Sequence, residues 1–334
     1  MFDTGLAGGS PFFRPARYDG AGGLQVRIVS IGEILWDVIG QTEYLGGAPL
    51  NFAAHAHKLG HEVALVSGVG DDDRGHRALH DLQKCGVSAE FVQLRRGKRT
   101  GTAEVELGPD GKPMFRIVRP AAYDFVNLTR PQVKRLADWQ PQWIYFGTLY
   151  HTSKRALDST LKLLQEIPAA KRFYDVNLRD GNWNLTTVEQ LASLANVIKL
   201  SDSEAEFLDA SLNADGAEGS VEHFCRRWSD QYHCKTICVT LGERGCGIYK
   251  DGRYTEIPGC KVEVADTVGA GDAFAAAFLH GLDQGWDVGR CGTFANAVAA
   301  LVASRPGAIP DWSVEEVRSL LGSGDFRDPG EWSV

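Results

Sequence analysis

Residues 264–282 read VADTVGAGDAFAAAFLHGL, and this stretch decides how the rest of the chain is interpreted. It predicts a short strand that reaches Asp266 and Thr267, a glycine-rich turn over 269–271, and an Ala-rich helix opened by Asp272. Small residues let the backbone approach a ligand closely, and the first N–H groups of a helix attract an anion. The stretch therefore predicts an anion-binding turn beside a carboxylate. An Asp at this position also caps helices that bind no ligand.

Outward from this stretch, strand-like and helix-like segments alternate along the chain. The predicted strands are short apolar runs at 26–32, 61–70, 143–149, 171–177 and 196–201. The predicted helices are longer runs at 49–60, 73–86, 153–167 and 187–195. This alternation indicates right-handed crossovers and an α/β fold, with a mostly parallel sheet covered by helices on both faces.

One segment breaks the alternation. Residues 99–118, RTGTAEVELGPDGKPMFRIV, contain two strand-like runs joined by the turn sequence PDGK, and no helix covers them. Together with the strand-like QTEYLGG at 41–47, they predict a small sheet. Such a sheet is either a lid over a site, which can also join two subunits, or a hairpin packed on the surface.

The composition excludes several classes of protein. The chain has 334 residues, is 43% hydrophobic and carries a formal net charge of −8, so it lacks the broad basic surface that nucleic acid requires. No apolar run is long enough to cross a bilayer, and the first residues do not resemble a signal peptide. We expect a flexible tail over 1–24, one catalytic unit over 25–325 with lid segments near 41–48 and 99–119, and a C-terminal tail over 326–334.

Seven scattered cysteines indicate reduced thiols and a cytoplasmic protein. Cys234 and Cys238 stand near His233, which makes a metal site conceivable, but packing as small apolar residues is the favoured interpretation. His55 and His57 are two residues apart on a predicted helix and point in different directions, so they do not predict a metal site. The run 71–73, three Asp residues, is expected to cap the helix that follows.

Further motifs follow one another along the chain. They are SIGEILWD, LGGAPLNFAAHAHKLG, VSGVGDDDRG, DVNLRDGNW, IKLSDSEAEFL, VTLGERG and ANAVAALVASRPGA. Together with D-T-x-G-A-G-D at 266–272, they resemble the ribokinase-like (PfkB) carbohydrate kinases in the family's own order, from about Val26 onward. The resemblance implies a three-layer α/β/α sandwich with a small β-sheet lid. It also implies transfer of the γ-phosphoryl group of ATP, with Mg²⁺, to a sugar hydroxyl.

The same resemblance implies a role for each matching residue. Asp272 corresponds to the catalytic base, and the anion hole corresponds to Gly269, Ala270 and Gly271. The sugar-contacting positions correspond to Asp37, Gly46, Gly47 and Asn51. The nucleotide and metal–triphosphate positions correspond to Lys199, Ser201, Glu204, Thr240, Gly242, Gly245 and Asn296. A monovalent cation, K⁺ above all, is implied near Asp266, Val268, Val302, Arg305, Gly307 and Asp311.

Two of these positions have a plain structural alternative. Many family members carry Asn where this chain has Ser201, whereas Glu204 is kept, and fructokinase-like members commonly have Ser there. Glu204 is also placed to interact with the dipole of its own helix, and Asp266 to hydrogen-bond its own turn.

The sequence leaves alternatives for the acceptor substrate and for the functional class of the protein. The motifs look most like those of fructokinases, with 2-keto-3-deoxygluconate, ribose or a nucleoside as alternative acceptors. An NAD-dependent Rossmann enzyme shares the fold class, but the first strand lacks the GxGxxG motif. A kinase-like protein that only binds its ligand, as a sensor, is the non-enzymatic alternative. The partners we expect are therefore a small sugar and ATP, with a homodimer through the lid.

Overall fold

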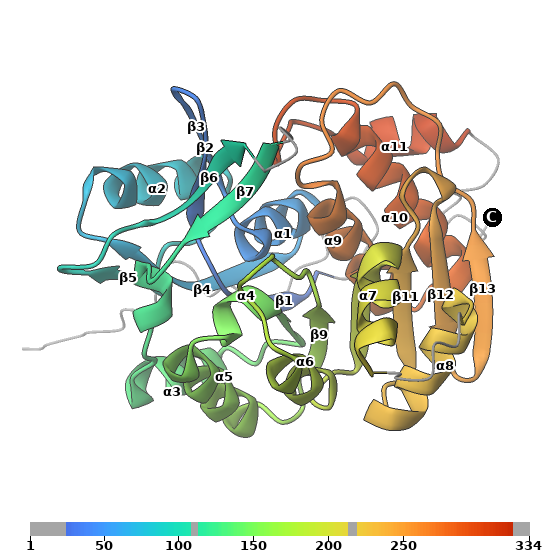
Figure 1. Cartoon of the computed structure of the whole chain (residues 1–334), viewed down its shortest axis with the longest axis horizontal. Helices are drawn as coiled ribbons and strands as arrows, with labels where there is room; N and C mark the ends of the chain where they lie inside the picture. The colour runs from blue at the N-terminus through green and yellow to red at the C-terminus, as the bar shows by residue number, and fades with distance from the viewer. Residues whose placement is uncertain (1–24, 108–112, 213–218, 323–334) are drawn as a thin grey trace, which may run out of the picture.

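The computed structural model describes residues 25–107, 113–212 and 219–322 (Figure 1). The expected tails and the whole PDGK turn lie outside these residues. The strands are β1 (Arg27–Ile31), β2 (Leu35–Ile39), β3 (Thr42–Gly46), β4 (Glu62–Gly70), β5 (Val92–Arg95), β6 (Gly101–Leu107), β7 (Pro113–Val118), β8 (Trp143–Gly147), β9 (Lys171–Asp175), β10 (Val197–Ser201), β11 (Thr236–Thr240), β12 (Cys246–Lys250) and β13 (Arg253–Ile257). The α-helices are α1 (Ala48–Lys58), α2 (Asp73–Lys84), α3 (Arg130–Asp138), α4 (Thr148–His151), α5 (Lys154–Glu166), α6 (Leu185–Ala192), α7 (Asp202–Leu212), α8 (Val221–Tyr232), α9 (Ala270–Asp283), α10 (Val288–Ala303) and α11 (Val314–Leu321).

The large sheet has nine strands in the order β13-β12-β11-β10-β9-β8-β1-β4-β5. The seven strands from β11 to β5 in this order are parallel, and β12 and β13 are added antiparallel at one edge. Helices connect the successive parallel strands, as parallel pairing requires. The predicted α/β fold with a mostly parallel sheet is confirmed.

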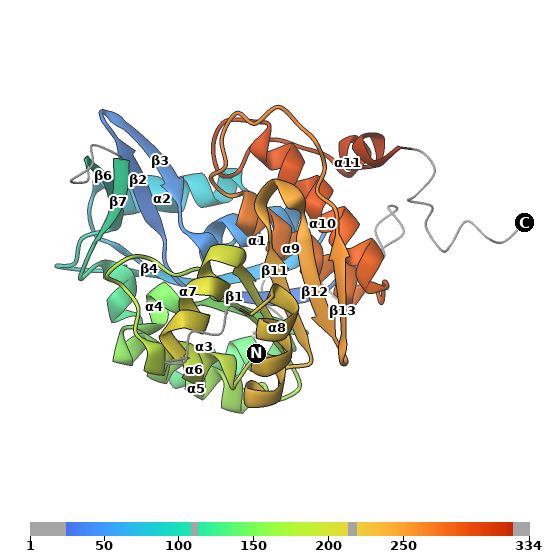
Figure 2. The same cartoon turned by 45° about the vertical axis from the view of Figure 1, so that its right-hand side comes forward.

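The strand residues alternate between two hydrophobic cores. Ile28, Tyr145 and Phe173 belong to the core that contains residues of α1, α9 and α10. Their chain neighbours Val29, Ile144 and Tyr174 belong to the core that contains residues of α3, α5 and α8. Because successive side chains of a strand point to opposite faces, the sheet separates two helical layers, which Figures 1 and 2 show on its two sides.

A second sheet has four strands in the order β3-β2-β6-β7. Its outer pairs are antiparallel, and the central pair of β2 and β6 is parallel. This confirms the small sheet expected from 41–47 and 99–118. The strand β2, which begins within the motif SIGEILWD and ends at Ile39, was not expected from the sequence, because its hydrogen-bonding partners β3 and β6 are other segments of the chain.

The prediction of a strand that reaches Asp266 and Thr267 is wrong. After β13 the chain runs without regular structure to α9, which begins at Ala270. The amides of Ala265 and Asp266 both donate to the carbonyl of Ala303, at 2.9 and 3.1 Å, instead of pairing with a strand. The segment therefore crosses the end of α10 on its way to the site.

The cysteines pack as apolar residues. Cys225, Cys234, Cys238, Cys246 and Cys291 are buried, Cys85 and Cys260 are half-buried, and none is in a disulfide. The described part of the chain has no cluster of three or more His, Cys, Asp or Glu arranged to hold a metal ion. Within residues 25–107, 113–212 and 219–322, no helix combines the length and apolar character that crossing a bilayer requires.

Candidate active site

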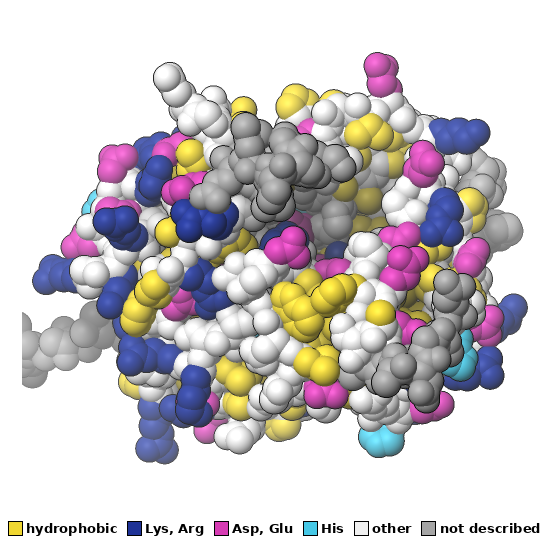
Figure 3. All heavy atoms as spheres, viewed as in Figure 1, with side chains coloured by type: hydrophobic (Ala, Val, Ile, Leu, Met, Phe, Trp, Pro, Cys, Tyr) yellow, Lys and Arg dark blue, Asp and Glu magenta, His cyan; other side chains and the backbone are white. Residues whose placement is uncertain are grey.

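A cavity of about 480 Å³ lies where the small sheet meets the start of α9. Its walls come from β2, β3, β6, β7, the start of α1, and the loops before α9 and α11. Figure 3 shows the surface hollowed between the side that carries the small sheet and the side that carries α10 and α11. Many of the residues implied by the resemblance line this cavity: Asp37, Gly47, Asn51, Lys199, Asp266, Val268, Gly269, Gly271, Asp272 and Gly307.

Asp272 occupies the first turn of α9. Its side chain is buried and accepts a hydrogen bond from Asn51 Nδ2 at 2.8 Å. Gly269, the residue before the helix, has φ 80°, and a methyl group on it would lie 2.3 Å from the carbonyl oxygen of Ala308. Only glycine fits both the left-handed conformation and this close approach. The turn therefore fixes a carboxylate next to the positive end of a fourteen-residue helix.

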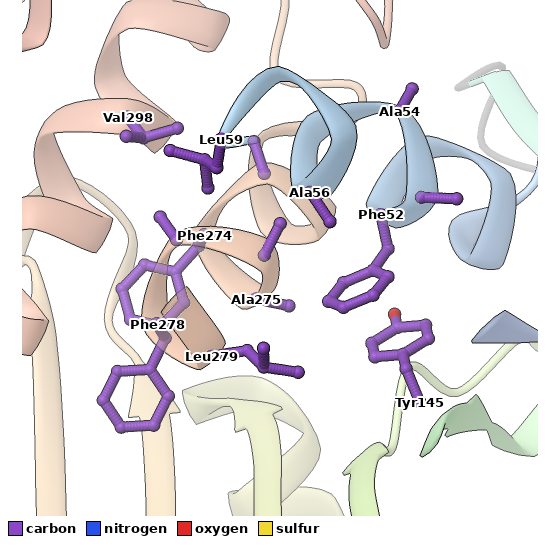
Figure 4. Close-up of a cluster of buried hydrophobic side chains, with 14 of the residues drawn as sticks. Phe52, Ala54, Ala56, Leu59, Tyr145, Phe274, Ala275, Phe278, Leu279 and Val298 are labelled. Atoms are coloured by element: carbon purple, nitrogen blue, oxygen red, sulfur yellow. The ribbon is translucent and has the colours of Figure 1, made fainter. Parts of the chain in front are cut away.

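Packing between α1 and α9 brings Asn51 to Asp272 across 221 residues of sequence. The Ala-rich α9 is buried on most of its surface, and Figure 4 shows its Phe274, Ala275 and Phe278 in the same cluster as Phe52 of α1. The ring of Phe52 stacks on Tyr145, with centroids 3.8 Å apart and planes 7° from parallel. Small side chains on α9 allow this close helix packing, so the alanines of the motif position the site.

A buried ion pair lies beneath the carboxylate. Lys199 Nζ is 3.1 Å from both oxygens of Asp175, and Tyr145 OH donates to Asp175 at 2.9 Å. Both members of the pair are buried, and Lys199 reaches the cavity wall. A methyl group on Gly271 would lie 3.3 Å from Lys199 Nζ. The ammonium therefore lies next to the turn that is expected to bind the transferred phosphoryl group.

Burial, and to a lesser extent the negative charge of Asp175, raise the pKa of Asp272 to about 7. The charges of Lys199 and Arg179 and the hydrogen bond from Asn51 act in the opposite direction. A base with a pKa near the working pH is suited to proton transfer. The electrostatics of the site therefore fit Asp272 as a general base.

The sugar-side residues meet through the pairing of β2 with β3. Asp37 lies on β2, and a methyl group on Gly46 would lie 2.8 Å from Asp37 Oδ2. Gly47 has φ 115°, and a methyl group there would lie 2.4 Å from the carbonyl oxygen of Glu33. Burial raises the pKa of Asp37 to about 6, and the charge of Arg179 opposes this shift. Gly46 therefore leaves room for Asp37 at the cavity wall, and Gly47 lets the chain pass close to the backbone of Glu33.

The charged and amide residues of the cavity that were missed as functional residues from the sequence are Glu33, Asn177 and Arg179. Each lies in a quoted motif, Glu33 in SIGEILWD and the other two in DVNLRDGNW. Each also follows the carboxyl end of a parallel strand, which is where α/β sheets bind ligands. This position in the sequence could have identified them as candidate ligand-binding residues. Glu33 is buried, and burial raises its pKa.

Most residues assigned to the nucleotide lie outside this cavity, at the ends of β10 and β11 and on α10. Ser201 and Thr240 are paired in register at those strand ends. Gly242 and Gly245 have φ 59° and 100° in the turn after β11. Asn296 Nδ2 donates to the carbonyls of Ile257 and Pro258 at 3.3 and 3.0 Å, which fixes the exit of β13 beside α10.

The Glu204 carboxylate accepts hydrogen bonds at the start of its own helix and from the loop after β9. Its carboxylate accepts from the amide of Leu178 at 2.5 Å, and from the amide and hydroxyl of Ser201 at 2.7 and 3.0 Å. These bonds join the loop after β9 to the start of α7. Glu204 therefore positions the loop that carries Asn177 and Arg179.

The residues expected around a cation are only partly together. Asp266 accepts from the amides of Val268 and Gly307, both at 3.0 Å, so the two loops meet at its carboxylate. Val302 is buried on α10, and the Arg305 side chain binds the carbonyl of Asp311 and the carboxylate of Glu316.

The position of Asp311 departs from the expectation. Its carboxylate is fully exposed and pairs with Lys58 at 2.9 Å, because the chain turns outward before α11. It does not line the cavity. We therefore remove the Asp311 side chain from the candidate cation ligands.

His55 contacts the loop that contains Gly307 and Ala308. Trp312 Nε1 donates to His55 Nδ1, and His55 Nε2 lies 3.0 Å from the carbonyl oxygen of Ala308. Because Nδ1 accepts, Nε2 is the nitrogen that donates to Ala308. This buried contact fixes the loop against which Gly269 packs.

Known proteins share this arrangement over most of the chain. The model of the pfkB family of carbohydrate kinases matches residues 26–315. A fructokinase of Solanum tuberosum is 31% identical over 319 residues, which are 89% of this chain and 96% of that protein. The crystal structure of fructokinase with bound ATP from Xylella fastidiosa has a TM-score of 0.74 at 26% identity and covers 88% of this chain and 98% of that one. An uncharacterized sugar kinase from Pyrococcus horikoshii has a TM-score of 0.70 at 28% identity, covering 85% and 93%.

These matches set aside the nicotinamide-dependent and non-catalytic alternatives. The matched region contains the small sheet, the cavity and the GAGD turn at the start of α9. The chain belongs to the pfkB family of carbohydrate kinases and is a sugar kinase.

Proposed function

We propose that this sugar kinase transfers the γ-phosphoryl group of ATP to a hydroxyl of D-fructose. The observation that carries the proposal is the buried carboxylate of Asp272, which faces a cavity large enough for a monosaccharide at the positive end of α9. The fructokinases among its relatives support fructose as the acceptor.

In this mechanism Asp272 takes the proton of the attacking hydroxyl as the new O–P bond forms. Asn51 holds the carboxylate in place through its 2.8 Å hydrogen bond. The turn of Gly269, Ala270 and Gly271 offsets the negative charge that develops on the phosphoryl group, helped by the nearby ammonium of Lys199. Asp37, Gly46 and Gly47 hold the sugar so that one hydroxyl faces Asp272.

We place ATP along the ends of β10 and β11, with its triphosphate directed toward α9. Gly242 and Gly245 leave the backbone at the two ends of this turn without side chains, and Thr240, Ser201 and Asn296 border it. Mg²⁺ supplies charge neutralisation between the β- and γ-phosphates when it accompanies ATP. The oxygens of Glu204 already accept three hydrogen bonds, so this residue orders the metal–triphosphate region through the loop it holds.

An alternative acceptor is 2-keto-3-deoxygluconate, which carries a carboxylate. The observation that favours it is Arg179, which lines the cavity and, within the described residues, makes only a 3.4 Å hydrogen bond, to the carbonyl of Leu178. A guanidinium at this rim suits a carboxylate of the substrate. Fructose, ribose and nucleosides offer no such charge.

The test compares fructose, 2-keto-3-deoxygluconate, ribose and a nucleoside in a coupled assay of ADP release. We expect fructose to give the highest kcat/KM, and Arg179→Gln to change it by less than about threefold. A much higher kcat/KM with 2-keto-3-deoxygluconate, lost in Arg179→Gln, would show that the acceptor is the acid sugar.

The same assay tests the base. Asp272→Asn keeps the shape of the side chain and its bond to Asn51, so we expect kcat to fall about a hundredfold or more with little change in ATP affinity. Asp158→Asn, on the exposed surface of α5, is the matched control and should leave kcat unchanged. Normal turnover by folded Asp272→Asn would refute the assignment.

We also propose activation by K⁺ bound between the loops that Asp266 joins. Backbone carbonyls of Val268, Val302, Arg305 and Gly307 are the further candidate ligands. Their chemistry fits, because a carboxylate and carbonyl oxygens are hard ligands of the kind that hard cations prefer. Asp266 would orient the turn before Asp272 through this ion.

Turnover should rise when KCl replaces tetramethylammonium chloride at constant ionic strength, and Asp266→Asn should remove the response to K⁺. A flat response to K⁺, Na⁺ and NH₄⁺ would leave Asp266 a structural residue.

A further inference from the structure

A second hollow, of about 700 Å³, shares no lining residue with the active-site cavity. It lies between the end of β5, the turn that follows it, and the start of α5. We call it the basic hollow, and its lining residues are Leu94, Arg95, Arg96, Lys98, Phe125 and Arg155. Figure 3 shows Lys and Arg side chains gathered over the side of the molecule that carries β5, α3 and α5. Four of its six lining residues are therefore cationic.

The ring of Phe125 holds two of these cations. Lys98 Nζ lies 3.8 Å from its centroid, and the Arg155 guanidinium lies 5.8 Å from it. Both distances are within the range in which a cation is attracted to an aromatic face. Two positive groups therefore lie against the same ring, which itself lines the hollow.

Among the described residues, a carboxylate neutralises only one of the four cations. Arg96 Nε is 3.6 Å from Asp71, and Arg95 Nη1 bonds the neutral side chain of Gln93 at 3.2 Å. Within the described residues Arg95, Lys98 and Arg155 form no ion pair with an acidic side chain. The chain carries 43 acidic against 35 basic residues, so such a cluster is not a consequence of general composition.

Helix α5 adds to the positive potential. Ser153 caps it by accepting from the amide of Ala156, and Arg155 is its second residue. The positive end of the helix dipole thus lies at the wall of the hollow. Side-chain charges and helix dipole act in the same direction there.

We propose that the basic hollow is a second anion site, which binds the phosphate group of a small phosphorylated molecule. Guanidinium groups match the geometry of phosphate oxygens, and hydrogen bonds between charged groups are the strong ones. A dianion supplies the negative charge that the protein does not. A hollow lined by six residues on an acidic chain suits a small molecule, since nucleic acid needs an extended basic surface.

The experiment measures hydrogen exchange with three ligands added separately at constant ionic strength: inorganic phosphate, fructose 1-phosphate and AMP. We expect at least one of them to slow exchange in peptides covering 92–99 and 150–157, independently of peptides covering 266–273 in the active site. The ligand with the lowest Kd for this effect identifies the source of the phosphate. The readout requires no turnover, so it stands or falls separately from the proposed fructokinase activity.

The double variant Lys98→Gln with Arg155→Gln should raise that Kd at least tenfold. Both side chains are exposed, so the variant should fold and keep its ATP turnover. The matched control is Arg130→Gln with Lys162→Gln, which makes the same change in charge on α3 and α5 outside the hollow and should leave the Kd unchanged. The proposal is overturned if no ligand protects the two peptides, or if the Lys98→Gln, Arg155→Gln variant is protected as well as the unaltered chain.

Discussion

The buried carboxyl of Asp272 links the activity of this kinase to its stability. In the folded chain its pKa is about 7, whereas an Asp in an unfolded chain has a pKa near 3.9. The folded state therefore binds the proton more tightly. The stabilisation from this proton is complete below about pH 4 and is lost as the pH rises to about 7.

We therefore expect Asp272→Asn to be more stable than the unaltered chain, by an amount that grows from pH 5 to 7 and then levels off. A shift of this size corresponds to a few kcal/mol, because each pKa unit is about 1.4 kcal/mol. Urea unfolding at pH 5, 6, 7 and 8 measures the difference. In the unaltered chain kcat/KM should fall below about pH 7, as the base becomes protonated. A stability difference independent of pH would contradict the raised pKa.

At the scale of elements, α2 fastens the small sheet. Glu43 of β3 accepts hydrogen bonds from Arg74 at 2.9 and 2.5 Å and also pairs with Arg77. The Arg77 guanidinium lies 4.6 Å from the ring of Trp36, whose Nε1 donates to the carbonyl of Arg74 at 3.0 Å. These contacts join the sheet that borders the sugar site to a helix of the core.

Glu43→Gln should loosen this attachment and leave the chemistry intact. The three side chains are partly exposed, so the loss of stability should be no more than about 1 kcal/mol. We expect KM for the sugar to rise several-fold with kcat nearly unchanged. Exchange over 41–48 and 99–119 should be faster, and less slowed by sugar.

Glu104→Gln is the control within the same sheet, because Glu104 lies 4.0 Å from its partner Arg116 and is more exposed. Equal effects of the two variants, or identical exchange with and without sugar, would count against closure of the small sheet as a lid. Pairing of two chains through this sheet is a separate proposal, which sedimentation of the unaltered protein tests.

At the scale of the whole molecule, one of the two cores beside the large sheet supports the start of α9. Phe278 of α9 packs in the first core, with Phe274 at 5.9 Å and Phe173 at 6.4 Å between ring centroids. Trp228 of α8 packs in the second core, against Phe224 at 4.8 Å. Both side chains are fully buried.

Phe278→Ala and Trp228→Ala should therefore cost similar stability, about 3–5 kcal/mol each. Only Phe278→Ala should lower kcat of the folded protein, because it removes packing that holds the start of α9. Unfolding curves and assays well below each Tm measure the two effects. Equal losses of kcat in both variants would mean that the site depends on the sheet as a whole.

Local sequence determined the fold class and the centre of the site. The alternation of strand and helix segments predicted the parallel sheet, because their periodicity reflects which face is buried. The turn at 269–271 and Asp272 were predictable, since a glycine-rich turn and a helix start act within a few residues. Asp72 likewise caps α2 as expected, by accepting from the amide of Gly75 at 2.8 Å.

Tertiary structure alone decided which distant residues meet there. The bond from Asn51 to Asp272 depends on the packing of α1 against α9, and the pair of Asp175 with Lys199 depends on two neighbouring strands. The missing strand at Asp266, and the outward side chain of Asp311, follow from how the ends of α10 and α11 lie in space. Such contacts arise from the packing of elements far apart in the chain, for which a single sequence carries no local periodic signal.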